Sequence, residues 1–419
     1  MTRARLSPVL RRRARRARGG FTLVELMVAM TGGLFLSIVV FALSRDATQF
    51  YQRESRLANA TLAGVNGFDR LAADVARAGH MSSPNIKADP RVCNRPEDGW
   101  PDAIENLRAV VIDTSGDSVS GTEVEAAGIT PHSIQLSGAF DTTEELYTNS
   151  IEIVSGGFSV SLNRDTPAAR RLGLSPLPAD EAQNAEVLAS RFMAGSSGRI
   201  VRLRKDGKEQ YGLVASVSAD ANTATLTLAD EPALRFRQKD GVQCGIDGTG
   251  KDYGVSIINI VRYELRSMKD SVPYKALFDA AGRNAPFEDK RAELVRVELD
   301  ADGQPIESTR EIIAEYAVDL HFSAWSATSS TVATVIPVSA DSFTPLTGSP
   351  QLLRGLNVRL SVRSREADRM AGVTGDSPLW HRIPLGPPVK YPDMQPHARV
   401  RTFQSDIPMR NLENHRWPG

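Results

Sequence analysis

The feature that most constrains this chain is an apolar stretch close to its N-terminus. Residues 21–43 read FTLVELMVAMTGGLFLSIVVFAL and contain a single charged side chain, Glu25. As a helix, a stretch of this length would rise about 34 Å, which is enough to cross the roughly 30 Å hydrocarbon core of a bilayer. No other stretch of this kind occurs in the sequence. We therefore predict that residues 21–43 form the transmembrane half of a longer helix.

The distribution of charge predicts the orientation of this helix. Residues 1–20 contain eight arginines and no acidic residue, whereas the rest of the chain carries 42 basic and 50 acidic side chains. The positive-inside rule keeps residues 1–20 in the cytoplasm and sends the chain after residue 43 across the membrane. Such asymmetry is expected of a targeting segment rather than of a nucleic-acid-binding body. Residues 1–20 are therefore interpreted as a basic leader peptide.

Two simpler interpretations of the N-terminus leave one residue unexplained. An ordinary signal peptide, cut near Ala42-Leu43-Ser44, would have an apolar region of only about 7–15 residues. A plain single-span anchor would have no need of Glu25, because an ionisable group inside a span costs about 2.5–3.5 kcal/mol on insertion scales. The bland alternative for Glu25 is a carboxylate that snorkels to the membrane interface.

The residues around Glu25 resemble a known signal. Residues 19–26 read GGFTLVEL, which is similar to the type III signal of type IV pilin-like proteins. In that family a membrane prepilin peptidase cuts after the glycine and methylates the new N-terminus, while the apolar helix remains. The resemblance implies cleavage between Gly20 and Phe21, N-methylation of Phe21, and an assembly role for Glu25. Our hypothesis is that one subunit's terminal amine meets a neighbour's Glu25, since paired buried charges offset each other's desolvation.

The apolar stretch is expected to continue as an amphipathic stalk helix over residues 44–79. Apolar side chains recur there mostly at three- and four-residue steps, and Gly79 is a plausible C-terminal cap. We predict one helix over residues 21–78, bent at Gly64 and Gly67. Residues 67–79 read GFDRLAADVARAG and resemble the stalk end of PilW-type minor pilins. The alternative is an ordinary amphipathic helix.

The remaining sequence is dominated by strand signals. Strands are predicted at residues 108–113, 133–140, 151–154, 200–203, 211–217, 223–228, 255–265, 294–299, 317–325 and 356–362, and a weak helix at 180–192. Turn sequences at residues 205–208 and 300–303 predict β-hairpins at these positions. The fold class is therefore α+β, a long N-terminal pilin helix packed on an enlarged antiparallel β head over residues 80–375. Residues 155–250 are interpreted as an inserted β subdomain. Residues 376–419 are a Pro-rich C-terminal segment. Within it, residues 399–403 resemble a closing strand of PilW-like proteins.

Cys93 and Cys244 are the only cysteines. A head outside the cytoplasm permits a disulfide, and we predict that the two residues pair. The entropic model gives such a long loop up to about 5 kcal/mol of stabilisation. The alternative is two free or buried thiols.

Sequence motifs for catalysis are incomplete. Residues 245–252 read GIDGTGKD, but Asp252 replaces the hydroxyl residue of a P-loop, and strand-like rather than helical sequence follows. The six histidines are scattered, and we expect no enzyme activity, no cofactor and no metal site. The basic cluster at residues 199–208 is interrupted by Asp206 and Glu209, so no nucleic acid is expected as a partner. Arg359, Arg363 and Arg365 are expected to decorate an exposed strand face.

The resemblance implies a structural role. It describes a minor pilin of a type IV pilus that primes or caps the fibre through its N-terminal helix. Its partners would be prepilin peptidase, other major and minor pilins, the inner-membrane assembly platform and membrane lipid. The protein would lie in the inner membrane, with a cytoplasmic N-terminus and a periplasmic head, and then on the cell-surface pilus. A pseudopilin of type II secretion is the alternative of the same class. An adhesin or DNA-binding tip module would need an exposed aromatic or basic groove.

Overall fold

The structure is a computed structural model of the whole chain. It describes residues 22–96, 99–175, 181–220, 223–240, 244–272, 274–276, 278, 290–327, 335–338, 349–365, 380–382 and 397–413. By internal contacts the chain divides into two units, Met1–Ser55 and Arg56–Gly419. The leader, residues 1–20, lies outside the described residues, as does most of the Pro-rich segment.

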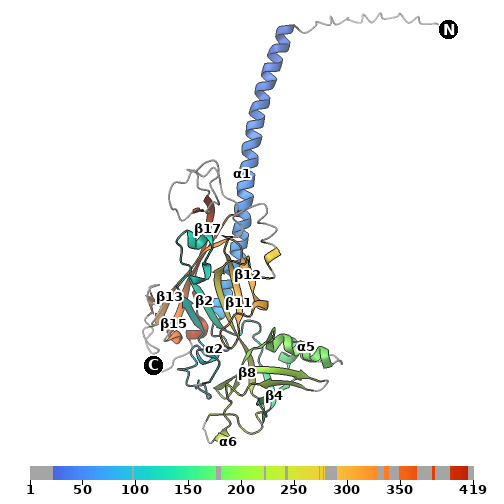
Figure 1. The fold of residues 1–419 in the computed structure, drawn as a ribbon, viewed down its shortest axis with the longest axis vertical. Helices are drawn as coiled ribbons and strands as arrows, with labels where there is room; N and C mark the ends of the chain where they lie inside the picture. The colour runs from blue at the N-terminus through green and yellow to red at the C-terminus, as the bar shows by residue number, and fades with distance from the viewer. Residues whose placement is uncertain are drawn as a thin grey trace, which may run out of the picture. The chain divides into compact units, whose positions relative to one another are not determined.

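One long helix and many antiparallel strands make up the described chain, so the predicted α+β class is confirmed (Figure 1). Helix α1 covers Leu23–Arg77 without interruption, close to the predicted 21–78. It ends because Gly79, which follows it closely, adopts a left-handed backbone with φ 73° that glycine tolerates without a steric penalty.

Within the second unit, α1 buries one face against the head. Leu71 and Val75 are fully buried in the largest core cluster, together with strand residues from two sheets. Gly64 and Gly67 have a packing role that the sequence did not indicate. A side chain at Gly64 would collide with the ring of Phe403, and one at Gly67 would place its Cβ 2.8 Å from Cβ of Ala314.

The first sheet of the head lies along α1. Its antiparallel order is β1-β2-β10-β11-β12. The strands are β1 (Val110–Asp113), β2 (Ser133–Gly138), β10 (Gly254–Arg266), β11 (Glu293–Leu299) and β12 (Glu311–Ala314). Strand β10 is the longest of them and pairs with β2 over Asn259 to Tyr263 and with β11 over Ile260 to Arg266.

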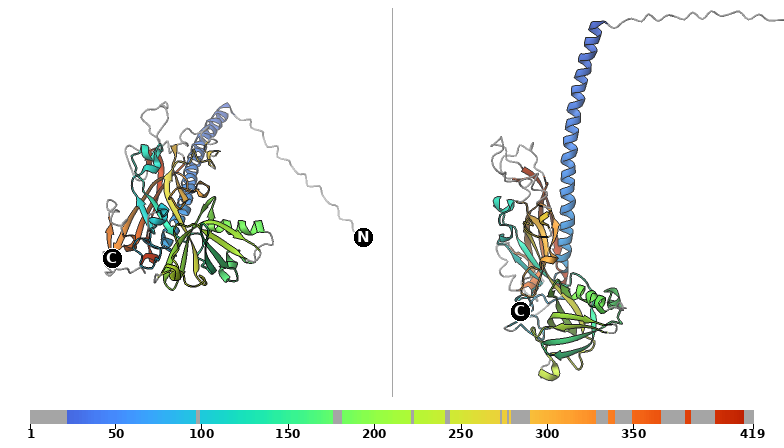
Figure 2. Two further views of the ribbon diagram at one scale, coloured as in Figure 1. Left: turned by 60° about the horizontal axis from the view of Figure 1, so that its bottom comes forward. Right: turned by 45° about the vertical axis from the view of Figure 1, so that its right-hand side comes forward.

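The first residues of β10 belong to a second structure, a closed barrel. The strands β3 (Leu146–Val154), β4 (Gly157–Asn163), β9 (Ala224–Leu228), β8 (Lys208–Ala219) and β7 (Ile200–Lys205) pair in that order. Strand β10 pairs with β3 at Gly254–Val255 and with β7 over Gly254 to Ile258, which completes a ring of six antiparallel strands. A closed ring leaves no free strand edge. The barrel, green in Figure 2, contains the stretch 155–250 for which an inserted subdomain is predicted.

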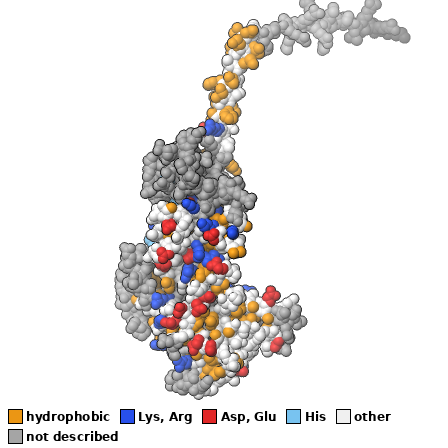
Figure 3. Space-filling view, in the orientation of Figure 1, with side chains coloured by type: hydrophobic (Ala, Val, Ile, Leu, Met, Phe, Trp, Pro, Cys, Tyr) orange, Lys and Arg blue, Asp and Glu red, His pale blue; other side chains and the backbone are white. Residues whose placement is uncertain are grey.

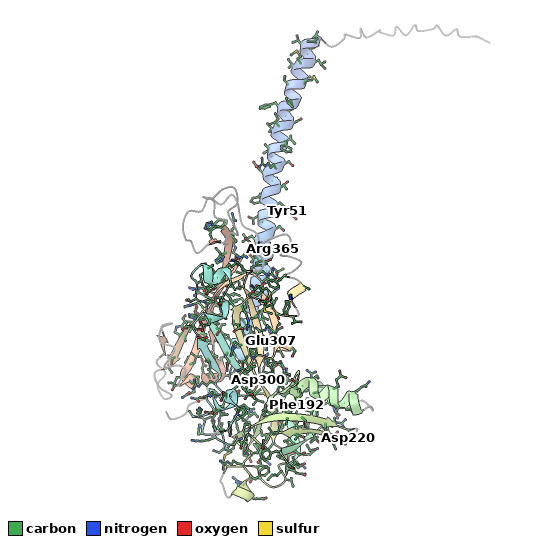
Figure 4. The ribbon with its side chains drawn as sticks, in the orientation of Figure 1. Tyr51, Phe192, Asp220, Asp300, Glu307 and Arg365 are labelled. Atoms are coloured by element: carbon green, nitrogen blue, oxygen red, sulfur yellow. A yellow bond between two sulfur atoms is a disulfide. The ribbon has the colours of Figure 1, made fainter. Side chains whose placement is uncertain are left out.

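The barrel has its own core. Apolar side chains from all six strands and from α4 (Pro167–Arg171) and α5 (Glu181–Phe192) form one buried cluster. Phe192, labelled in Figure 4, is fully buried at the end of α5. Helix α5 was predicted from the sequence, whereas β4 was not.

The second sheet has the order β14-β13-β15-β17-β16. Its strands are β14 (Val335–Val338), β13 (Ala317–Ala327), β15 (Leu353–Arg363), β17 (His397–Pro408) and β16 (Trp380–Arg382). Strand β17 includes the predicted strand at 399–403. The prediction that Arg363 lies on an exposed strand face is wrong. The side chain is buried, and its guanidinium donates two hydrogen bonds to the carboxylate of Glu123.

The other described elements are short. They are α2 (Asp102–Glu105), η1 (Asp117–Val119), α3 (Glu123–Ala126), β5 (Met193–Ala194), β6 (Ser197–Gly198), α6 (Arg237–Asp240), η3 (Glu307–Thr309), η5 (Pro350–Leu352) and α9 (Arg410–Glu413).

A buried polar cluster fixes α1 to the first sheet. Asp74 of α1 is 1% exposed, and its Oδ2 accepts hydrogen bonds from Oη of Tyr263 at 2.7 Å and from Nε of Arg296 at 3.0 Å. Burial and the Asp74 charge raise the pKa of Tyr263 well above its ordinary value, so the phenol keeps the proton that it donates. We refer to these three residues as the Asp74 cluster.

We predict that Asp74→Ala lowers the free energy of unfolding by about 3–5 kcal/mol, because it leaves the Arg296 charge buried without its closest partner. Tyr263→Phe should cost about 1 kcal/mol, since it removes one hydrogen bond. Asp69→Ala, an exposed position on the same helix, is the control and should change stability by less than about 0.5 kcal/mol. Urea unfolding of the detergent-solubilised chain measures all three, and equal effects of Asp74→Ala and Asp69→Ala would contradict the prediction.

Candidate functional site

The first turn of α1 is built around Thr22 and Glu25. Oε2 of Glu25 accepts hydrogen bonds from the backbone N–H and the hydroxyl of Thr22, both at 3.0 Å. The hydroxyl of Thr22 accepts one from the backbone N–H of Glu25 at 3.2 Å. This reciprocal pair is a capping box, with Thr22 as N-cap and Glu25 three residues later. The carboxylate also lies at the positive end of the helix dipole.

The capping box explains how Glu25 can exist at the start of an apolar helix. Two of its hydrogen bonds come from Thr22 within the same chain, so the carboxylate is not left without donors. The carbonyl of Thr22 accepts the first helical bond, from Leu26 N–H at 3.1 Å. The sequence predicts a role for Glu25 but none for Thr22, although the T-x-x-E spacing is typical of a capping box. Gly20 and Phe21, the predicted cleavage and methylation residues, lie outside the described residues.

An apolar span follows immediately. The segment Leu23–Thr48 is long and apolar enough to cross a membrane, and none of its most apolar window is buried by the rest of the chain. Orange side chains mark it along the upper helix in Figure 3. The hydroxyls of Thr31 and Ser37 donate to backbone carbonyls one turn earlier, such as that of Gly33 at 2.8 Å. These polar groups are therefore satisfied inside the helix, as an apolar environment requires.

The two cysteines are bonded to each other in the structure. Cys93 and Cys244 form a disulfide with Cα atoms 5.4 Å apart, a separation that is usual for bonded cysteines. Cys93 is also held by its backbone N–H, which donates to the carbonyl of Glu209 at 2.8 Å. The bond joins the loop before α2 to the loop that leads into β10, so it links the barrel to the rest of the head.

We predict that peptides containing Cys93 and Cys244 remain cross-linked in a non-reducing digest analysed by mass spectrometry. Reduction should lower the free energy of unfolding by about 2–5 kcal/mol, because a long loop is released in the unfolded chain. The double variant Cys93→Ser with Cys244→Ser is the control, since it should unfold like the reduced protein and ignore reductant. Two thiols that react with iodoacetamide without prior reduction would contradict the pairing.

The basic cluster near the β7–β8 turn is used within the fold. Arg199 makes a two-pronged ion pair with Glu298, with both distances at 2.9 Å. Arg202 is buried beside Glu209, and Lys205 donates to the carbonyl of Lys251 at 2.8 Å. These three cations therefore do not form an open basic groove.

The near-match to a P-loop is a turn. Residues 245–252 precede strand β10, as predicted, and no helix begins there. The hydroxyl of Thr148 donates to the carbonyl of Gly250 at 2.6 Å, and the phenol of Tyr253 accepts from Asp247 N–H at 2.9 Å. The segment packs against the barrel rather than cradling a phosphate. Among the residues that the structure describes, no group of three or more His, Cys, Asp or Glu side chains could hold a metal ion.

Comparison with known proteins bears on the first helix. Residues 15–31 match the family model described as the prokaryotic N-terminal methylation motif. The chain carries a type IV pilin-like prepilin signal. The matched segment contains Gly20, Phe21 and Glu25, and it extends into the apolar span. No curated protein matches the chain, and no solved structure does.

Proposed function

We propose that this protein is the precursor of a minor pilin of a type IV pilus, of the PilW type. The observation that carries the proposal is the methylation motif at residues 15–31, placed at the start of an apolar helix. That helix, α1, continues without a break from the span to the head. A cleavable leader, a retained apolar helix and a large head are the parts that a co-assembling subunit needs.

The proposed topology follows from the charges. The eight arginines of residues 1–20 hold the leader in the cytoplasm by the positive-inside rule. The head then lies in the periplasm before assembly and on the cell-surface pilus afterwards. A periplasmic head is also where the disulfide between Cys93 and Cys244 would persist.

The proposed processing creates a charge next to Glu25. Cleavage after Gly20 by prepilin peptidase exposes an amine on Phe21, which the same enzyme methylates. In a bundle of such helices, the amine of one subunit meets the carboxylate of Glu25 in its neighbour. Since Thr22 already supplies two hydrogen bonds to that carboxylate, the neighbour's amine supplies the missing opposite charge. A buried pair that is fully hydrogen-bonded avoids the penalty of an isolated ion.

The first test of this proposal is the mature N-terminus. N-terminal sequencing and mass spectrometry of the protein from cells with prepilin peptidase should find N-methylated Phe21. In cells without the peptidase, the chain should keep residues 1–20. Gly20→Ile should block cleavage in the presence of the peptidase, because a bulky side chain hinders access to the backbone. A mature chain that begins beyond residue 43 would identify an ordinary signal peptide and contradict the proposal.

The second test is assembly in a deletion strain. Deletion should abolish or strongly reduce surface pili and twitching, and the wild-type gene should restore them. We expect Glu25→Ala to fail to co-assemble, because the neighbour's amine loses its carboxylate. Glu54→Ala, an exposed acid on the same helix beyond the span, is the matched control and should restore pili. Wild-type incorporation of Glu25→Ala would contradict the docking role.

The same test separates the closest alternative. A pseudopilin of type II secretion would carry the same methylation motif, because the motif directs processing and assembly and does not reveal what the finished fibre does. Deletion would then stop protein secretion and leave pili intact. The large head favours the pilus assignment.

A further inference from the structure

A cleft of about 1190 Å³ opens on the head where β2 begins and β10 ends. Its walls come from the ends of β1 and β2, the residues after β10, and the η1 and η3 segments. Glu307, labelled in Figure 4, belongs to its lining. The volume is somewhat larger than the roughly 300–1,000 Å³ of most small-molecule sites, so an extended ligand would be needed to fill it. Nothing in the proposed assembly role uses this cleft.

The floor of the cleft carries three half-buried polar side chains with unused hydrogen-bonding capacity. Arg262 on β10 lies directly opposite Gln135 on β2 in the strand register, and Ser133 is two residues from Gln135 on the same face. All three line the cleft and are partly exposed. Within the part of the chain that the structure describes, none of their side chains forms a hydrogen bond or an ion pair. The register therefore groups a guanidinium, an amide and a hydroxyl that have no side-chain partner among the described residues.

Two acids near Arg262 are already paired with other arginines. Glu264, two residues along β10, is held by Arg266 at 3.3 Å and by Arg310 at 3.5 Å. Glu307 forms hydrogen bonds with Arg310 through both of its oxygens. Arg262 itself forms no ion pair within the described residues, so a ligand that reaches it meets a cation without a carboxylate partner. The lining as a whole is not basic, since Asp113, Asp117 and Asp270 also belong to it, and the negative group of a ligand is therefore favoured at Arg262 rather than across the whole cleft.

We propose that this cleft binds a carboxylated saccharide, with the sugar carboxylate on Arg262. The planar guanidinium matches a carboxylate in a two-pronged geometry, and the Gln135 amide can donate to the same group. The rest of the lining suits a ligand rich in hydroxyls, because six serines face the cleft: Ser118, Ser120, Ser133, Ser267, Ser271 and Ser308. Asp117 and Asp270 add acceptors for sugar hydroxyls.

The same lining disfavours a peptide. It contains no aromatic residue, and its only aliphatic or thioether side chains are Val111, Met268 and Val272. A peptide gains much of its specificity from apolar side chains seated in pockets, and this cleft offers few such contacts. A hydroxyl-rich anion uses the polar groups that are present.

The test is a calorimetric titration of the full-length protein in detergent micelles with trigalacturonate. Maltotriose serves as the uncharged saccharide and a Glu-rich peptide as the acidic non-saccharide. We expect saturable binding of trigalacturonate alone. Arg262→Met should weaken it by about tenfold or more, since a charge-assisted two-pronged contact is lost. Arg204→Met, an exposed arginine on β7 outside the cleft lining, should leave the affinity unchanged.

A second variant keeps the test independent of folding. Gln135→Glu places a carboxylate opposite Arg262 and should abolish binding by occupying the guanidinium, while the thermal unfolding midpoint stays at or above that of the wild type. Absence of trigalacturonate binding at millimolar concentration, equal affinity in Arg262→Met, or tighter binding of the Glu-rich peptide would each overturn the proposal. None of these outcomes depends on fibre assembly, so the pilin assignment is tested separately.

Discussion

The two ends of helix α1 require different surroundings, and the rest of the structure depends on this difference. Helix α1 has 55 residues. Its first part is apolar on all sides and has no protein cover in the described chain, so lipid or other helices must bury it. Its last turns are amphipathic and lie in the largest core of the head. The Asp74 cluster adds a polar constraint at this end, because a buried carboxylate is tolerated only where its partners are in place.

At the other end of α1, the chain solves a similar problem with local hydrogen bonds. Thr22 and Glu25 satisfy each other within one turn, which lets an acid sit beside an apolar span. Two acids of the helix, Glu25 near its start and Asp74 near its end, differ in the groups that donate hydrogen bonds to them. Glu25 receives hydrogen bonds but no cation within the described chain, whereas Asp74 has Arg296. This difference is the physical basis for the proposal that Glu25 acts in assembly and for the prediction that Asp74 acts in stability.

Much of this architecture could be predicted from sequence because it rests on local patterns. The apolar run, the three- and four-residue spacing of the stalk and the alternation of Val255 to Leu265 each specify one element. Strand β4 is not predicted, although Phe158, Val160 and Leu162 alternate with polar residues, because the two glycines at its start are more typical of a turn. Arg363 was placed on an exposed face because its partner, Glu123, is 240 residues away. The position of Arg262 in the cleft could not be predicted either, because the pairing of β2 with β10 places it opposite Gln135 and distant residues such as Arg310 pair with the nearby Glu264.

Strand β10 has a consequence for how the head behaves as a mechanical body. Because its first residues close the barrel and its last residues form the centre of the sheet that carries α1, the two structures share a single uninterrupted backbone. Strain applied to one would pass along that backbone into the other without crossing a hinge. The barrel and sheet should therefore melt together, as one cooperative unit.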